Sequence, residues 1–74
     1  MATFTPEEAQ KLQAYLQQKF GNPGITLRER KQANDSVEVL LNGEFIGVLY
    51  KDDEDQDDIS YDFNMAILAM DLAA

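Results

Sequence analysis

The residues most capable of chemistry in this 74-residue chain are carboxylates gathered in one stretch, residues 52–58. Within it, Asp53, Asp55 and Asp57 have the spacing of the first, third and fifth ligands of an EF-hand calcium loop. Hard cations such as Ca²⁺ and Mg²⁺ prefer several oxygen ligands at such spacing. The first chemical hypothesis is therefore that Asp53, Asp55 and Asp57 bind a divalent cation weakly.

The rest of the calcium-loop pattern is missing from this stretch. Asp58 stands at the sixth position, where the loop needs glycine, and Asn64 stands at the twelfth, where a bidentate glutamate is expected. A run of charges is more often a solvated loop. We therefore favour a plain acidic loop, whose clustered charge attracts cations weakly and is suited to docking a basic protein partner.

Other kinds of chemistry find little support in the composition. The chain contains neither cysteine nor histidine, which excludes disulfides and thiol nucleophiles and removes the commonest general base. A carboxylate pair such as Asp62 with Glu38 would need a pocket to tune its pKa values, and a chain this short rarely has room for one. We expect no enzymatic activity and no cofactor.

Charge and hydropathy narrow the range of partners. The net charge is −8, and residues 52–58 supply six of the 14 acidic side chains. Nucleic acids and anionic membrane surfaces are disfavoured as partners because their phosphates require cationic side chains, and Arg28, Arg30 and Lys31 form only a small basic cluster. The longest apolar run, residues 65–70, is too short to span a membrane. Because no signal peptide is recognisable either, we expect a cytoplasmic protein.

A single domain, residues 1–74, must position these groups, and its first element is a helix from about Pro6 to Phe20. Thr5 is a good N-cap residue, and Glu8 completes a capping box with it. Gly21 suits the position after the last helical turn. The apolar residues of the helix recur along one stripe, which comprises Ala9, Leu12, Leu16 and Phe20.

The middle of the chain predicts a β-hairpin. Asn42-Gly43 separates two apolar runs, residues 37–41 and 44–50, and Asn-Gly favours a two-residue type I′ turn because both positions need positive φ. An uninterrupted register then fixes the cross-strand neighbours. The expected pairs are Leu41 with Glu44, Leu40 with Phe45, Val39 with Ile46, and Val37 with Val48.

Two further strands complete the predicted sheet. Residues 25–30 alternate in polarity before turn-forming residues 32–36, and residues 59–67 alternate over a longer stretch. A helix over residues 64–72 is the alternative for the chain's end, but we favour a strand to Leu68. The predicted fold class is α+β, with the N-terminal helix packed on a four-stranded antiparallel meander in a two-layer α-β-β-β-β arrangement.

The predicted register gives the sheet two different faces. The apolar residues expected to face the helix are Val37, Val39, Ile46 and Val48. Leu40, Phe45 and Leu49 fall on the opposite face, and an exposed apolar patch often marks an interface. We predict that these three residues contact a protein partner or form a homodimer. The alternative is that Met70 and Leu72 fold back over them.

Several segments of the chain resemble a family of short alphaproteobacterial proteins known as a domain of unknown function. These segments are residues 11–16, 20–23, 43–50, 52–55 and 60–68. The resemblance covers nearly the whole chain and implies a cytosolic bacterial protein that stands alone as one domain. It implies no active site, and the alanine-rich end, Ala69 and Ala73-Ala74, departs from the more acidic ending of the family.

The sequence therefore predicts a small non-enzymatic protein-protein interaction or regulatory module. Its interaction surface is expected to be the sheet face of Leu40, Phe45 and Leu49, the acidic loop, or both. Divalent-cation binding by residues 52–58 is the alternative function.

Overall fold

The computed structural model describes residues 4–31 and 33–73, and its first element is a helix capped at both ends, α1 (Pro6–Phe20). Thr5 Oγ1 accepts a hydrogen bond from the Glu8 backbone N–H, and the Glu8 carboxylate accepts one from the Thr5 backbone N–H. Gly21 ends the helix with a φ of 62°, in the left-handed region. The predicted helix and its capping box are confirmed.

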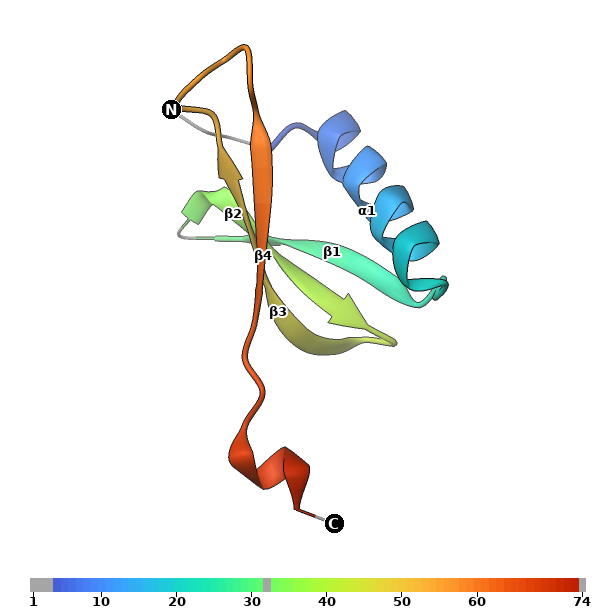
Figure 1. Ribbon diagram of the computed structural model, residues 1–74. Coiled ribbons are helices and arrows are strands. Elements are labelled where there is room, and N and C mark those ends of the chain that lie inside the picture. The colour runs from blue at the N-terminus through green and yellow to red at the C-terminus, as the bar shows by residue number, and fades with distance from the viewer. Residues whose placement is uncertain (1–3, 32, 74) are drawn as a thin grey trace.

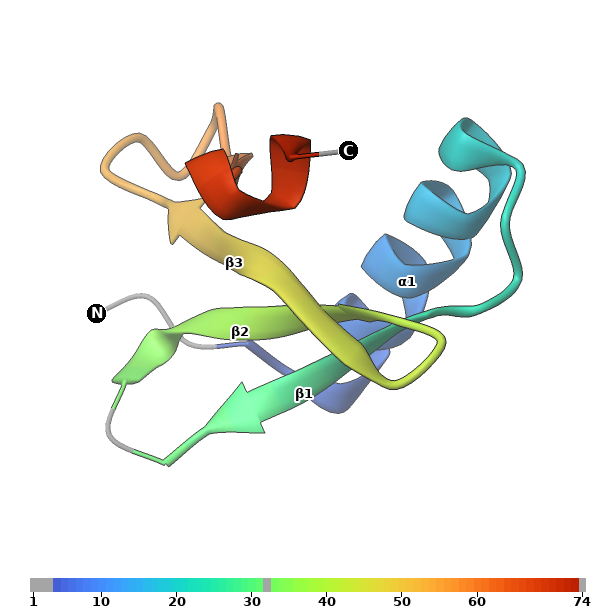
Figure 2. The same ribbon diagram turned by 90° about the horizontal axis from the view of Figure 1, so that it is seen from below.

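The four strands form one open antiparallel sheet, in the order β1-β2-β3-β4 along the chain (Figure 1). Their bounds are β1 (Ile25–Arg30), β2 (Ala33–Leu41), β3 (Glu44–Asp52) and β4 (Ser60–Met65). Asn42 and Gly43 connect β2 to β3 with φ values of 53° and 85°, as a type I′ turn requires. The predicted α+β meander is confirmed, and α1 lies on one side of it (Figures 1 and 2).

The register of the β2–β3 hairpin differs from the predicted one beyond the first two pairs. Leu40 pairs with Phe45 as expected, but Val39 pairs with Gly47 and Val37 pairs with Leu49, because a β-bulge shifts β3 by one residue. Gly47 marks the place: an added Cβ there would collide with the Asn64 carbonyl oxygen of β4. A glycine in a strand often accompanies a bulge or such a close approach.

The bulge moves Leu49 into the hydrophobic core. Leu49 is 3% exposed, and it packs under α1 in the cluster of Leu16, Ile25, Val37, Val39 and Leu49. The prediction that Leu49 lies on the face opposite the helix is therefore wrong, as is the prediction that Val48 faces the helix. The apolar pattern could not reveal the shift, because residues 45, 46, 48 and 49 are all apolar and satisfy either register.

The C-terminal segment lies beyond the sheet rather than against it. β4 ends at Met65, short of the predicted Leu68, and the predicted alternative helix is reduced to one 3₁₀ turn, η1 (Ala69–Leu72). Met70 and Leu72 are 76% and 74% exposed, so they do not fold back over the sheet. The molecule is elongated, 45 × 23 × 23 Å, and the segment projects from its end (Figure 1). Among the described residues, no helix has the length and apolarity to cross a membrane.

Candidate functional site

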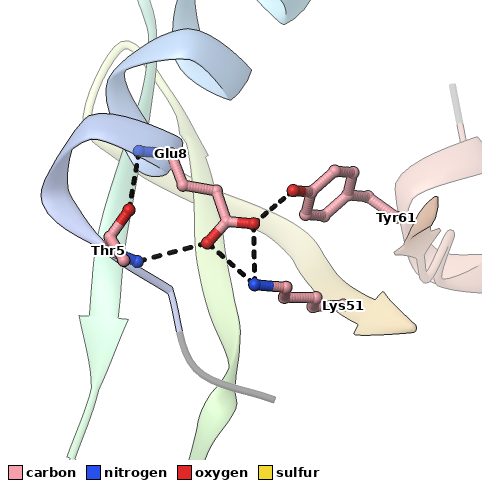
Figure 3. A network of polar contacts seen from close by, with 4 residues as sticks. All are labelled: Thr5, Glu8, Lys51 and Tyr61. Atoms are coloured by element: carbon pink, nitrogen blue, oxygen red, sulfur yellow. Dashed lines mark hydrogen bonds and ion pairs between the residues drawn. The ribbon is translucent and has the colours of Figure 1, made fainter. Parts of the chain in front are cut away.

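A network of polar side chains joins the start of α1 to the last two strands (Figure 3). The carboxylate of Glu8 accepts hydrogen bonds from the Lys51 ammonium group of β3, with N–O distances of 3.1 and 2.9 Å. It also accepts a short hydrogen bond from the Tyr61 hydroxyl group of β4. The Lys51 and Glu8 side chains are only 12% and 16% exposed, so solvent screens this ion pair less than it screens a surface pair.

The pKa shifts of Glu8 and Tyr61 keep the network in one protonation state over a wide pH range. Burial would raise the pKa of Glu8, but hydrogen bonds from Tyr61, Lys51 and Thr5 together hold it below its ordinary value. Burial and the hydrogen bond to Glu8 raise the pKa of Tyr61 to about 12. Glu8 thus stays ionised and Tyr61 stays protonated near neutral pH, which suits a structural clamp better than a proton-transfer site.

Two aromatic contacts hold β4 against the rest of the molecule. The rings of Phe4 and Tyr61 have centroids 6.0 Å apart, and Phe20 meets Phe63 edge-on at 6.4 Å. Together with the polar network, these contacts attach β4 near both ends of α1. An element fixed in this way presents its remaining surface in a defined orientation.

That remaining surface is apolar on the helix side of β4. Tyr61, Phe63 and Met65 share this face because strand side chains alternate, and the same alternation continues outside the strand at Ile59 and Ile67. Ile59, Met65 and Ile67 are 45%, 53% and 67% exposed. We call these five residues the β4 stripe.

An apolar groove of about 400 Å³ lies beside the β4 stripe, between α1 and the last two strands. The side chains that line it include Leu12, Tyr15, Leu16, Phe20, Leu49 and Phe63. Phe63 belongs to both features, so the groove and the stripe form one continuous apolar surface. Tyr15 and Phe20 are more than half exposed along it.

The two outer edges of the sheet differ in how their backbone groups are satisfied. At β1, Gln13 of α1 accepts a hydrogen bond from the Leu27 backbone N–H at 3.1 Å, and Gln17 donates one to the Ile25 carbonyl oxygen at 2.9 Å. Within the described ranges, 4–31 and 33–73, no side chain makes such a bond to the outer edge of β4. β4 also contains neither proline nor lysine, the residues that commonly protect an edge strand.

The acidic loop does not assemble a cation site. No group of three or more acidic side chains converges on a common point in the part of the chain that the structure describes. Asp55 instead accepts a hydrogen bond from the Asp57 backbone N–H at 3.0 Å, and Asp52 accepts one from Glu54 at 3.2 Å. These carboxylates stabilise local turns. Cation binding by Asp53, Asp55 and Asp57 stays a prediction without a preformed site.

The structure separates the other residues that the sequence singled out. Leu40 is buried, whereas its cross-strand neighbour Phe45 is 51% exposed, and Leu49 belongs to the core, so the three do not form one exposed patch. β3 lies between Glu38 and Asp62, and Glu38 pairs with Arg28 at 2.6 Å. The sequence interpretation missed the open edge of β4. The sequence feature that could have indicated it is the alternation of residues 59–67, which extends beyond β4 at both ends.

A family model described as "Protein of unknown function (DUF3126)" matches residues 8–71 of the chain. The chain belongs to this family, which confirms the resemblance to a domain of unknown function. No curated protein and no solved structure matches the chain.

Proposed function

We propose that this member of the DUF3126 family is a small, non-enzymatic protein-binding module that adds an extended polypeptide segment to the outer edge of β4. The observation that carries the proposal is the combination of a β4 backbone edge that no side chain of residues 4–31 or 33–73 bonds to with the exposed apolar stripe beside it. In strand addition, backbone hydrogen bonds supply affinity, and side chains at alternate positions supply specificity. β4 offers both features in one strand.

The exposed side chains indicate the chemistry of the segment that binds. Met65 and Ile67 are the most exposed members of the β4 stripe, and they are two residues apart. A bound strand therefore needs apolar side chains at alternate positions that face the same side of the sheet. Because the chain carries a net charge of −8, mostly in the neighbouring acidic loop, strongly acidic segments are disfavoured.

The polar network supports a binding role rather than a catalytic one. The Glu8 carboxylate accepts hydrogen bonds from Thr5, Lys51 and Tyr61. These bonds fix β4 against α1. The cysteine-free composition fits a reducing compartment, and we propose the cytoplasm as the place where this module works.

The proposal is tested by comparing two lysine variants as baits in extracts of the producing cells. Ile67→Lys places a charge on the β4 stripe, whereas Phe45→Lys places one on another apolar site that is more than half exposed, at the β2–β3 hairpin. We expect quantitative mass spectrometry to find polypeptides that the wild-type chain and Phe45→Lys retain and Ile67→Lys loses. Equal retention by both variants, or loss only from Phe45→Lys, would contradict the proposal.

A further inference from the structure

We infer that the segment added to β4 is the β4 strand of a second copy of the same chain, so that two molecules form one continuous antiparallel sheet about a twofold axis. The inference rests on the proposed function and names its partner. Four observations support it: the area that the chain exposes, the self-complementarity of its edge, the separation of its acidic loops and the closure of its other edge.

The chain exposes more surface than a monomer of its size should. A folded monomer of 8.4 kDa exposes roughly 4,600 Å², whereas this chain exposes 5821 Å². Its radius of gyration is 13.2 Å, against roughly 11 Å for a compact chain of this length. The excess area, roughly 1,200 Å², is shared between the β4 stripe and the projecting residues 66–73, and it exceeds the roughly 800 Å² that each partner removes from water in a standard interface.

The β4 edge is complementary to itself when Phe63 lies opposite Phe63 of the second copy. An antiparallel pair about a twofold axis keeps both helix-facing sides on one face, so residues whose numbers sum to 126 become neighbours. Within β4, Asp62 then faces Asn64 and Tyr61 faces Met65. Pairing that continues one residue or more beyond Ser60–Met65 in each copy also places Ile59 opposite Ile67. The pairing brings the exposed side chains of the two β4 stripes into lateral contact. A register centred on Asp62 instead would place two like charges opposite each other.

The same arrangement keeps the two acidic loops apart. Residues 52–58 precede β4 in each copy, and antiparallel pairing places the two loops at opposite ends of the strand pair. The six residues of β4 separate them by about 20 Å at about 3.4 Å per residue. This distance exceeds the Debye length of about 8 Å at physiological ionic strength, so the negative charge of the chain does not prevent self-association.

The closed edge of β1 limits the assembly to two molecules. Gln13 and Gln17 already bond to the Leu27 N–H and the Ile25 carbonyl oxygen on that side, so a strand added there would have to displace them. Pairing through β4 alone is isologous and uses the same surface on both copies, so it closes after one contact. A dimer, rather than a filament, is the expected product.

Sedimentation equilibrium of the purified full chain, from about 1 μM to 1 mM, tests the inference across the affinity range of transient interfaces. We expect the wild-type chain to convert from monomer to dimer within this range. Ile67→Lys should raise the dimer dissociation constant at least tenfold, and the matched control Phe45→Lys should leave it within about twofold, since only Ile67 lies in the pairing surface. Circular dichroism of both variants confirms that they remain folded.

Three results would overturn the inference. They are a wild-type chain that stays monomeric at 1 mM, a dimer that Ile67→Lys leaves unchanged, and a dimer that Phe45→Lys dissociates. A monomeric chain that still captures a different polypeptide through Ile67 refutes self-pairing alone and leaves the proposed function standing. A monomeric chain whose Ile67→Lys variant captures the same polypeptides as the wild type refutes both.

The absence of native cysteine allows a direct test of the register. Asp62 and Asn64 are both exposed, so Asp62→Cys and Asn64→Cys can be prepared separately and mixed. Directly opposite residues have Cα atoms about 4.5–5.5 Å apart, within disulfide range, whereas diagonal neighbours are about 7–8 Å apart. We expect mixed disulfide dimers to exceed dimers of either variant with itself. Preferential self-linking of either variant would exclude the register centred on Phe63.

Discussion

β1 and β4 are the two outer strands of one sheet, and they differ in whether side chains bond to their outer backbone edge. α1 satisfies β1 by side-chain hydrogen bonds from Gln13 and Gln17 to its backbone. In the described part of the chain, β4 is held by pairing with β3 on its inner edge and by the contacts of Tyr61 and Phe63 with the helix region. The same helix therefore bonds to the backbone of β1, whereas it contacts β4 through side chains.

The contrast between β1 and β4 indicates which part of a small domain stays available for binding. Among the described residues of this 74-residue chain, one α-helix covers the sheet, and its side-chain hydrogen bonds to a strand backbone are made to β1. An edge strand left open usually carries proline, lysine or a bulge. β4 has none of these features and carries exposed apolar side chains, so we interpret its openness as functional.

The largest expected effect concerns the register of the β2–β3 hairpin, which places Leu49 in the core. Leu49→Ala should lower the free energy of unfolding by about 2–5 kcal/mol, because Leu49 lies buried beneath α1 and pairs with Phe63. Val48→Ala, one residue earlier and half-buried on the opposite face, should cost only about 1 kcal/mol. Urea denaturation measures both losses. Val48→Ala costing more than Leu49→Ala would favour the uninterrupted register.

The next prediction concerns the hydrogen bond from Tyr61 to Glu8, which holds β4 against α1. Tyr61→Phe should cost about 1.5–3 kcal/mol, because it removes a hydrogen bond to the ionised Glu8 carboxylate while keeping the ring contact with Phe4. Tyr50→Phe, on the neighbouring strand, is the matched control. Urea denaturation should give a loss near zero for that control, because Tyr50 is exposed and outside the network.

The pH dependence of this clamp has a definite sign. The pKa of Tyr61 rises from 10.0 to about 12 on folding, so its stabilising effect is complete below pH 10 and is lost as the pH rises towards 12. The stability difference between the wild-type chain and Tyr61→Phe should therefore shrink between pH 10 and 12. A difference that stays constant across that interval would show that Tyr61 is not held protonated by Glu8.

Opening the β1 edge should make the two edges alike. Replacing both Gln13 and Gln17 with alanine should cost about 1–3 kcal/mol, because two side-chain bonds to the β1 backbone are lost. It should also produce species larger than a dimer, since both edges then accept a strand. Light scattering detects them, with Gln10→Ala as the exposed helical control. A double variant that associates no further than the wild type would show that these glutamines do not protect β1.

The smallest effect is expected in the acidic loop. Replacing Asp53, Asp55 and Asp57 with asparagine should change the free energy of unfolding by no more than about 0.5 kcal/mol, since their side chains hold no converging site. Backbone amide shifts in residues 52–58 should show no saturable change as Ca²⁺ is added to millimolar concentration. Saturable binding that the triple variant loses would restore the cation hypothesis.

Much of the fold could be predicted because local signals agreed with one another. The capping box at Thr5 and Glu8 defines α1, and Asn42-Gly43 defines the hairpin turn. The register could not be predicted, because the bulge lies where Gly47 closely approaches β4, and the pattern of either strand alone does not contain that contact between segments. That one-residue shift placed Leu49 in the core, so Leu40, Phe45 and Leu49 do not form one exposed patch.

The candidate site was hidden for a related reason. The alternation of residues 59–67 predicted a strand, but whether its outer edge is covered depends on where α1 lies across the sheet. The ion pair between Glu8 and Lys51 joins residues far apart in sequence, so no local spacing predicts it. The acidic run, residues 52–58, is the most conspicuous charged feature of the sequence. In the structure, Asp52 and Asp55 of this run accept hydrogen bonds from backbone N–H groups two residues ahead, which are local turn contacts.

Backbone hydrogen exchange at increasing protein concentration tests the central claim most directly, because it reads both edges in one experiment. We predict that the outward-facing amides of residues 60–65 gain protection as the concentration rises. The Leu27 amide should stay unchanged, because Gln13 already accepts its hydrogen bond. Protection in β4 that is independent of concentration and of any added binding partner, or a gain centred on Phe45 instead, would contradict the account.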